Sequence, residues 1–342
     1  MKKFATLAVF AAISGGAWAQ SSVTLFGIID EAARYTKNGD LKLKSLVSGG
    51  INSSRFGVRG VEDLGGGLKA GFWLESGFNA DSGAQSDGSR FWNRRTTVSL
   101  IGNFGELRLG RDFTPTYTAY SDFDVFGDNG VAASGKFDSS LGTARDTGTR
   151  ADNQIMYLLP SNIGGVYGRA AVASGEGTAG KKYVGGRIGY AAGAFDVSAA
   201  YGQTEVAALV GDDKFKVAVL GASYDLGVVK LMGYYRENKF ADQKLAAYSL
   251  GAVAPIGLGQ LKASYTRANA SGTNATGTNV AANDADQFAV GYIYNLSKRT
   301  AVYGTAAYVK NKGNAAFNTN SALALAAGQK STGAEVGLRH AF

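Results

Sequence analysis

The sequence contains no cysteine and a single histidine, His340, among its 342 residues. The lack of cysteine excludes a disulfide framework, a cysteine-based zinc site and a thiol nucleophile. Proline is also scarce, at three residues, whereas the 49 glycines are about twice the roughly 7% share usual in proteins. Little of the common catalytic chemistry is therefore open to this chain, and its backbone is rich in turns or closely packed positions.

The first residues have the pattern of a targeting segment. Lys2 and Lys3 precede a ten-residue apolar stretch over 4–13, and Ala17-Trp18-Ala19 follows. A basic head, a short apolar region and an A-x-A site are typical of a secretory signal peptide, and the stretch is shorter than the roughly 20 residues of a spanning helix. We expect a signal peptide over 1–19 and one exported domain over 20–342. Removing both lysines lowers the net charge from +8 to +6.

No later stretch predicts a membrane helix, because the apolar residues occupy every second position. The clearest example is the alternation of Phe195, Val197, Ala199 and Tyr201 with Asp196, Ser198, Ala200 and Gly202. A period of two places these sets on opposite faces of a β-strand. A soluble β-sandwich gives the same pattern, so the alternation alone does not decide the class.

The connections between these strands alternate in length. Seven predicted connections are short: 62–67, 102–105, 161–164, 191–194, 225–228, 254–259 and 295–299. Eight are longer: 36–50, 79–89, 113–149, 175–182, 205–214, 239–243, 269–285 and 310–330. Pro115 and Pro255 fall in these segments, Pro160 lies one residue before the segment 161–164, and tyrosines recur near strand ends. The pattern predicts an all-β protein, a transmembrane antiparallel β-barrel of about 16 strands.

Several segments resemble those of the general bacterial porins, most closely the trimeric sixteen-stranded porins of the beta-proteobacteria. These segments are SVTLFGIID (22–30), SSRFGVRG (53–60), NRRTTVSL (93–100), FGELRLGR (104–111), RADNQIMY (150–157) and GLRHAF (337–342). The resemblance covers both termini and the first half. From about 175 to 330 it is limited to the spacing of strands and connections. It implies that the terminal aromatic residue, Phe342, is an assembly signal.

The resemblance also implies a pore constriction. The third long connection, about 113–149, is expected to fold inward and to bring Asp122, Asp124 and Asp128 to the pore as an acidic loop. A basic wall would face it, formed by Arg55, by Arg94 or Arg95, and by Arg150. Alternation favours Arg95 if Val98 and Leu100 face outward, whereas the motif alignment favours Arg94.

The expected function is that of a porin in the outer membrane of a Gram-negative bacterium. Small hydrophilic solutes and ions would diffuse through a water-filled barrel, with a preference for anions that follows from the net charge of +6 and the arginines. The expected partners are two further copies of the chain in a homotrimer, outer-membrane lipids, and the solutes themselves. We expect no nucleic-acid partner, cofactor, metal site or catalytic residue.

Two other functions remain open from the sequence. A solute-specific channel would use aromatic residues as a track, for which Phe113, Tyr117, Tyr120, Phe123 and Phe126 are candidates. An outer-membrane barrel enzyme is the less favoured alternative, because the only histidine lies two residues from the end of the chain.

Overall fold

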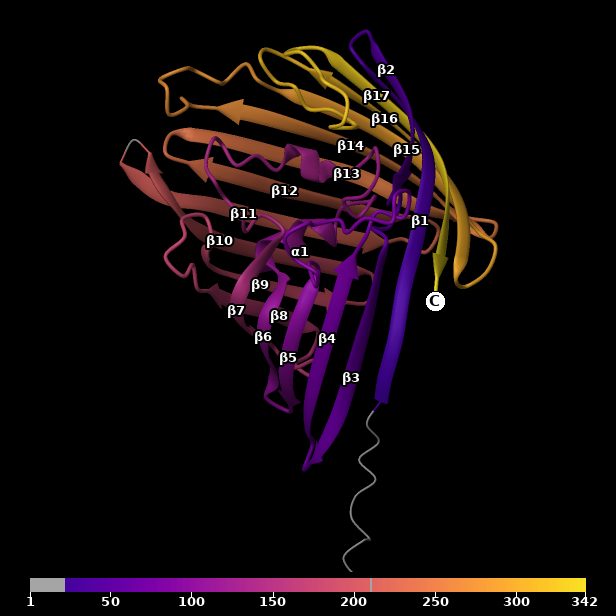
Figure 1. Cartoon of the computed structure of the whole chain (residues 1–342), viewed down its shortest axis with the longest axis vertical. Coiled ribbons are helices and arrows are strands. Elements are labelled where there is room, and N and C mark those ends of the chain that lie inside the picture. The colour runs from indigo at the N-terminus through magenta and orange to yellow at the C-terminus, as the bar shows by residue number, and fades with distance from the viewer. Residues whose placement is uncertain (1–21, 210) are drawn as a thin grey trace, which may run out of the picture.

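The structure is a computed structural model that describes residues 22–209 and 211–342. Its strands form one antiparallel sheet, and because the first strand pairs with the last, the sheet closes into a barrel (Figure 1). The predicted signal peptide over 1–19 lies outside the described residues. Among the residues that are described, no helix is long and apolar enough to cross a membrane.

Seventeen strand segments make up the wall of the barrel. They are β1 (Ser22–Asn38), β2 (Leu41–Ser48), β3 (Arg55–Gly65), β4 (Leu68–Gly77), β5 (Arg95–Gly102), β6 (Gly105–Phe113), β7 (Arg150–Leu158), β8 (Val166–Ala173), β9 (Lys182–Ala192), β10 (Phe195–Leu209), β11 (Asp212–Asp225), β12 (Lys230–Phe240), β13 (Gln243–Ile256), β14 (Gly259–Ser271), β15 (Ala285–Asn295), β16 (Thr300–Asn311) and β17 (Lys330–Ala341). β2 and β3 pair with successive stretches of β1, so they act as one interrupted strand. The predicted sixteen-stranded antiparallel barrel is confirmed.

The interruption between β2 and β3 is held by a buried carboxylate on β1. Asp30 is fully buried, and its carboxylate accepts hydrogen bonds from the backbone N–H groups of Gly50, Ile51 and Asn52 at 3.2, 3.0 and 2.7 Å. The Tyr303 hydroxyl on β16 also donates to Asp30. The N–H groups of residues 50–52 have no partner in the sheet because the chain bends away from β1 there. The Asp30 carboxylate accepts their hydrogen bonds in place of a neighbouring strand.

The two faces of the sheet carry the alternation expected of a barrel in a membrane. Outward residues are large and apolar, and several are more than 60% exposed, including Val23, Leu25, Leu250 and Val336. Inward positions carry polar, charged and small residues such as Glu75, Ser99 and Thr305. A soluble barrel would bury the apolar set, so this arrangement fits a surrounding layer of hydrocarbon.

The seven short connections are confirmed as turns, but three of the predicted long ones are wrong. Residues 36–50 and 239–243 are mostly strand, with turns at 39–40 and 241–242, and β10 and β11 extend into 205–214. Strands of 14 and 15 residues exceed the roughly 9–11 residues that cross a bilayer, so polar residues continue the ladder beyond the apolar band. Pro255, expected in a connection, is the next-to-last residue of β13 and lies opposite Gln260.

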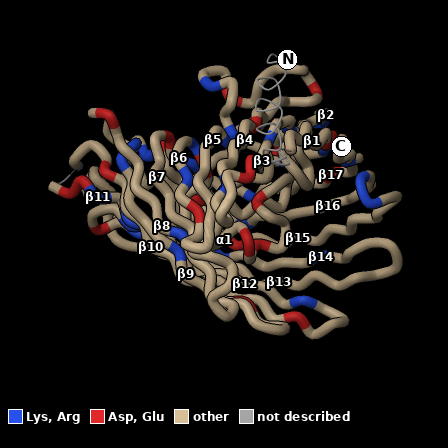
Figure 2. The backbone as a smooth tube through the Cα atoms, turned by 90° about the horizontal axis from the view of Figure 1, so that it is seen from below, with Lys and Arg blue, Asp and Glu red and all other residues tan. Residues whose placement is uncertain are grey.

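Residues 114–149 form the inner loop, which connects β6 to β7 and lies inside the barrel. It contains α1 (Pro115–Ser121) and the short 3-10 helix η1 (Ser134–Phe137). Figure 2 shows α1 within the ring of strands, and α1 contacts β8 to β12. The Thr114 hydroxyl caps α1 by accepting from the Tyr117 N–H at 3.4 Å, with Pro115 in the first turn. The inward fold expected for 113–149 is confirmed.

The barrel closes where the end of β17 meets β1. The backbones of Gly27 and Phe342 exchange hydrogen bonds of 3.1 and 3.0 Å. A methyl group on Gly27 would lie 2.3 Å from the Phe342 ring and 2.8 Å from the Arg55 carbonyl oxygen. Both contacts are too short, so this seam needs glycine for a close approach of side chain and backbone.

We predict that Gly27→Ala destabilises the barrel by about 1–3 kcal/mol, because the added methyl overpacks the seam. Gly71→Ala is the matched control, since its new methyl would have its nearest neighbour at 3.5 Å. Urea midpoints of both variants in detergent, compared with the wild type, measure the difference. Equal midpoints for the two variants would contradict this account of the seam.

Candidate functional site

One side of the lumen carries a cluster of arginines that we call the arginine wall: Arg55, Arg94, Arg95, Arg108, Arg111 and Arg150, on or beside β3, β5, β6 and β7. The first part of it surrounds Glu75 on β4. Arg94 Nε donates to Glu75 Oε1 at 2.6 Å, and Arg55 Nε lies 3.8 Å from the same oxygen. One carboxylate therefore holds two guanidinium groups from different strands.

The choice between Arg94 and Arg95 has a structural answer, since both belong to the wall. Arg95 lies directly opposite Glu75 in the β4–β5 ladder, on the face away from the exposed Val98 and Leu100. Arg94 precedes β5, so alternation does not govern its direction, and its side chain turns to Glu75. The two readings of the sequence describe neighbouring parts of one cluster.

Two more carboxylates are shared in the same way. Asp112 Oδ2 lies 3.5 Å from Arg95 Nε and 2.7 Å from an Arg108 nitrogen. Asp152 pairs with Arg111 at 2.6 Å and with Arg90 at 3.1 Å. The sequence does not single out Glu75, Asp112 and Asp152, because each meets an arginine from another part of the chain only after the strands have paired. Because each of these carboxylates binds two guanidinium groups, it holds both side chains in place but neutralises only one of the two positive charges.

Arg150 differs from its neighbours because no carboxylate among the described residues pairs with it. It lies opposite Phe113 where β6 and β7 meet the inner loop, and its guanidinium carbon is 4.0 Å from the centre of the Phe113 ring. That ring stacks on Tyr117 at 4.8 Å. The aromatic stack holds the guanidinium by a cation–π contact in place of an ion pair.

The inner loop packs against strands β10 to β16, on the side of the barrel opposite the arginine wall, and so leaves the arginines facing the lumen. Tyr120, Phe123 and Phe137 are almost fully buried, in one apolar cluster with inward residues from β10 to β16. The guanidinium of Arg236 on β12 lies 4.2 Å from the centre of the Tyr120 ring. Farther along, Glu335 on β17 accepts from the Val131 N–H at 3.1 Å and pairs with Arg34. The inner loop is therefore held to the barrel at two places, Tyr120 and Val131.

The predicted acidic residues of the loop do not form a common face toward the arginines. Asp124 is 5% exposed and accepts from the N–H groups of Phe126 and Asp128 and from the Ser134 hydroxyl. Asp128 is bound within the loop, by the Tyr120 hydroxyl at 2.9 Å and the Gly135 N–H at 2.5 Å. Asp122 is exposed but pairs with Arg187 on β9. Two of the three carboxylates thus organise loop turns, which the sequence did not reveal because the loop has no periodicity.

Two buried groups of the loop have displaced pKa values. Burial and the nearby charge of Asp124 raise the pKa of Asp128 to about 6. Burial lowers the pKa of Lys136 to about 8, and its ammonium donates to the Val131 and Ala133 carbonyls and to Gln287 Oε1 on β15. The loop therefore contains one group that titrates in mildly acidic solution.

His340 is on the outer side of the barrel, with its Nδ1 2.9 Å from the Thr300 hydroxyl. Phe342, the expected assembly signal, sits at the closing seam described above. No group of three or more His, Cys, Asp or Glu residues within 22–209 and 211–342 is arranged to hold a metal ion. The described lumen groups suit electrostatic sorting of solutes, through fixed guanidinium charges along a narrow gap.

Comparisons with known proteins agree with this geometry. The sequence pattern of the Gram-negative porin family matches residues 5–314. The chain is 41% identical to outer membrane porin protein 32 of Delftia acidovorans, over 100% of this chain and 99% of that protein. The anion-selective porin from Comamonas acidovorans superposes with a TM-score of 0.83 at 38% identity, covering 94% of this chain and 100% of that one. The trimer form of OmpT from Vibrio cholerae matches in fold, with a TM-score of 0.67 at 17% identity over 94% and 99% of the two chains.

We predict that Asp128→Asn changes the pH dependence of stability. Because the folded loop raises the pKa of Asp128 from 3.8 to about 6, the folded state binds this proton more tightly, and the wild type gains stability as the pH falls from about 7 to about 4. Asparagine keeps the shape and accepts the positive φ of 59° at this position. The variant should be more stable than the wild type at pH 7, by at most roughly 3 kcal/mol, and should lose this advantage near pH 4.

Thermal unfolding in detergent at pH 4.5–7 measures this difference. Asp87→Asn is the control, because hydrogen bonds from Ser89 lower the pKa of that half-buried carboxyl to about 2, so the effect of the substitution should not vary over this pH range. A difference between wild type and Asp128→Asn that did not vary with pH would show that the carboxyl has an ordinary pKa.

Proposed function

Because this chain belongs to the Gram-negative porin family, we propose that its outer-membrane channel passes small hydrophilic solutes by diffusion and prefers anions. The observation that carries the preference is the sharing of carboxylates in the arginine wall. Glu75 serves Arg55 and Arg94, and Asp152 serves Arg90 and Arg111. With Arg150 unpaired among the described residues, the lumen keeps a positive excess at every relevant pH.

The excess positive charge lies beside the narrowest part of the lumen, where little water is present to screen it. Sixteen strands enclose a lumen wide enough for water, and the inner loop narrows it by occupying the side lined by β9 to β16. The remaining gap lies beside the arginines. Charges on one wall of a narrow aqueous gap between low-dielectric surfaces attract anions and raise the barrier for cations. The loop's own acids offset this little, since Asp124 and Asp128 are engaged within the loop.

A general channel is favoured over a solute-specific one by the positions of the aromatic rings. Tyr120, Phe123 and Phe126 are at most 7% exposed, because they pack the inner loop onto the wall. Phe113 and Tyr117 are stacked beneath Arg150. These rings support the constriction and do not form a continuous exposed track for a sliding solute. No catalytic step is part of the proposed function, and the position of His340 on the outer side supports a channel over a barrel enzyme.

We predict that Arg55→Gln combined with Arg150→Gln lowers the anion-to-cation permeability ratio. One unit charge at 4 Å contributes about 1 kcal/mol in water, so each loss should make the constriction roughly five-fold less favourable for an anion, and the ratio should fall by at least that factor. The measurement is the reversal potential in planar bilayers under a salt gradient. The control, Lys37→Gln with Lys42→Gln, removes two charges from the exposed β1–β2 hairpin. An unchanged reversal potential in the arginine variant would refute its role in selectivity.

We also propose that the channel assembles as a homotrimer through the outer face of β1, β3 and β17. OmpT of Vibrio cholerae, which shares the fold, has been solved in a trimer form. Here the outer face of β1 presents Val23, Leu25 and Ile29 with exposures of 69, 64 and 43%. Small residues such as Gly60, opposite Val23, leave this face flat enough for a second barrel to approach.

The mass of the detergent-solubilised protein tests this assembly. We predict three chains for the wild type and dissociation for Leu25→Arg, which buries a charge at the interface. Leu250→Arg, at a 70% exposed site on β13, is the control and should stay trimeric. A monomeric wild type would disprove the trimer without affecting the selectivity result, which is measured on single channels.

A further inference from the structure

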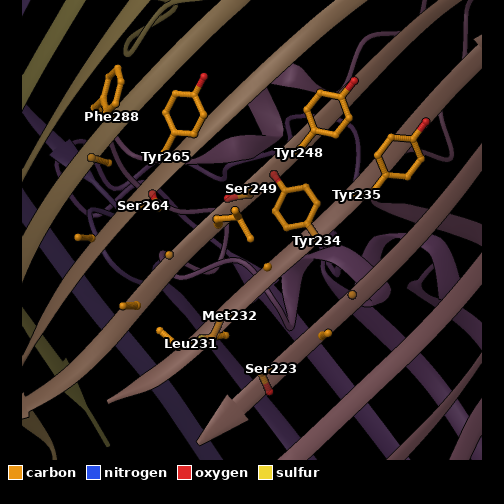
Figure 3. A pocket seen from close by; sticks show the side chains of 18 of the residues that line it. Ser223, Leu231, Met232, Tyr234, Tyr235, Tyr248, Ser249, Ser264, Tyr265 and Phe288 are labelled. Atoms are coloured by element: carbon orange, nitrogen blue, oxygen red, sulfur yellow. The ribbon is translucent and has the colours of Figure 1, made fainter. Parts of the chain in front are cut away.

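Many aromatic rings of the barrel wall lie on its outer face. Figure 3 shows some of them side by side on neighbouring strands: Tyr235, Tyr248, Tyr265 and Phe288. Rings in this arrangement form the girdle of an outer-membrane barrel at the membrane interface. Phe26 on β1 and Trp73 on β4 differ, because they face the lumen, so the girdle does not account for them.

The inward direction of these two rings follows from the strand register. Leu25 is exposed on the outer face of β1, so Thr24 and Phe26 on either side of it point to the lumen. Thr24 lies opposite Arg59 on β3, and Arg59 lies opposite Trp73 on β4. Paired residues share a face of the sheet. Phe26, Arg59 and Trp73 are therefore luminal neighbours on three adjoining strands.

The two rings are held in place by the wall around them. The Phe26 ring lies over Gly57, where an added methyl group would come within 2.6 Å of it, so glycine leaves the space that the ring fills. Trp73 Nε1 donates to Glu75 Oε2 at 3.1 Å. The rings meet edge to face with their centres 5.0 Å apart, and both are only half-buried. They present a fixed, partly exposed aromatic surface to the water of the lumen.

Arg59 adds a positive charge to this surface. Its guanidinium carbon is 5.2 Å from the centre of the Phe26 ring and 4.9 Å from that of Trp73. The side chain is exposed, and no carboxylate in the part of the chain that the structure describes pairs with it, whereas Glu75 is engaged by two other arginines. The guanidinium is therefore able to donate to a solute while the rings pack against it.

This surface lies beyond the constriction, toward the periplasm. Arg59 follows Arg55 by four residues on β3, about 13 Å, in the direction of the short turn to β4. Short turns are periplasmic in outer-membrane barrels. A solute from outside meets the surface after it has passed the arginine wall.

We propose that Phe26, Arg59 and Trp73 form a weak binding site, the ring site, for aromatic carboxylates that pass through the pore. The planar guanidinium donates two hydrogen bonds to the carboxylate, and the solute's ring packs against the exposed parts of Phe26 and Trp73. The inference rests on the proposed function, because the positive wall brings anions to the site. One site of this kind delays acids that carry an aromatic ring without making the channel specific for them.

The test compares benzoate with cyclohexanecarboxylate, which has the same charge and a similar size but no aromatic ring. Each acid is added, at a pH where both are ionised, to single channels of the porin conducting chloride in planar bilayers, over a series of concentrations. We expect benzoate to reduce the wild-type current saturably and at a roughly five-fold lower concentration than cyclohexanecarboxylate, which is the size of effect expected from an aromatic pair.

Three variants and one control assign this preference to the ring site. Phe26→Leu and Trp73→Leu should each remove most of the preference for benzoate. Arg59→Gln should weaken the block by both acids roughly five-fold, because it removes one charge. Phe72→Leu is the matched control, since Phe72 is exposed on the outer face beside Trp73 and should leave both acids unaffected. Phe26→Leu keeps the contact between Arg95 and Trp73, so its effect does not come from a displaced arginine wall.

Several results would overturn the ring site: equal block of the wild type by the two acids, an unchanged preference in both Phe26→Leu and Trp73→Leu, an equal loss in Phe72→Leu, or full block of Arg59→Gln. The reversal potential in chloride alone reports the anion preference separately, and we expect Phe26→Leu to leave it unchanged. A wild type without anion preference would refute the proposed function. Equal block by the two acids with the anion preference intact would refute the ring site alone.

Discussion

The structure depends on pairing every backbone N–H and C=O group within the sheet, because hydrocarbon offers no water to replace a missing partner. The pairing of β1 with β17 meets this requirement, along a register that runs from Ile28 opposite Ala341 to Asn38 opposite Ser331. Gly27 allows the last residue to reach the seam. Where the ladder must break, between β2 and β3, a buried carboxylate takes over as acceptor. Closure then fixes an apolar outside and a polar inside.

Closure of sixteen strands also creates a space too wide for wall side chains to fill, and the inner loop divides it. The loop attaches by burying aromatic side chains against β10 to β16, and Glu335 holds its far part through the Val131 N–H. This asymmetric attachment leaves the arginine wall facing the aqueous gap. The same carboxylates that keep the guanidinium groups in place are too few to cancel their charge, so rigidity and a positive field come from one arrangement.

The outer surface follows from the same geometry. Because β10, β11 and β13 are longer than the bilayer requires, polar residues continue the ladder beyond the outward apolar residues, and strand pairing sets Lys216, Lys239 and Lys244 side by side. Strand pairing fixes these side chains as neighbours whatever their charge. The barrel thus separates two groups of cationic residues, arginines that face the lumen and lysines on the outer surface.

Alternation and turn spacing in the sequence determined the barrel, its sixteen strands and the faces of residues such as Phe195 and Ser198, because a strand has a strict period of two. The inward loop and the basic wall came from the family resemblance. Only the tertiary structure decided that Arg94 and Arg95 share one cluster, that Asp124 and Asp128 serve the loop, and that residues 36–50 and 239–243 continue as strands. An irregular loop has no period from which a side chain's direction follows, and carboxylates choose their partners only after distant strands have met. The row of Lys216, Lys239 and Lys244 likewise exists only through register, since it joins residues of three strands that the sequence separates.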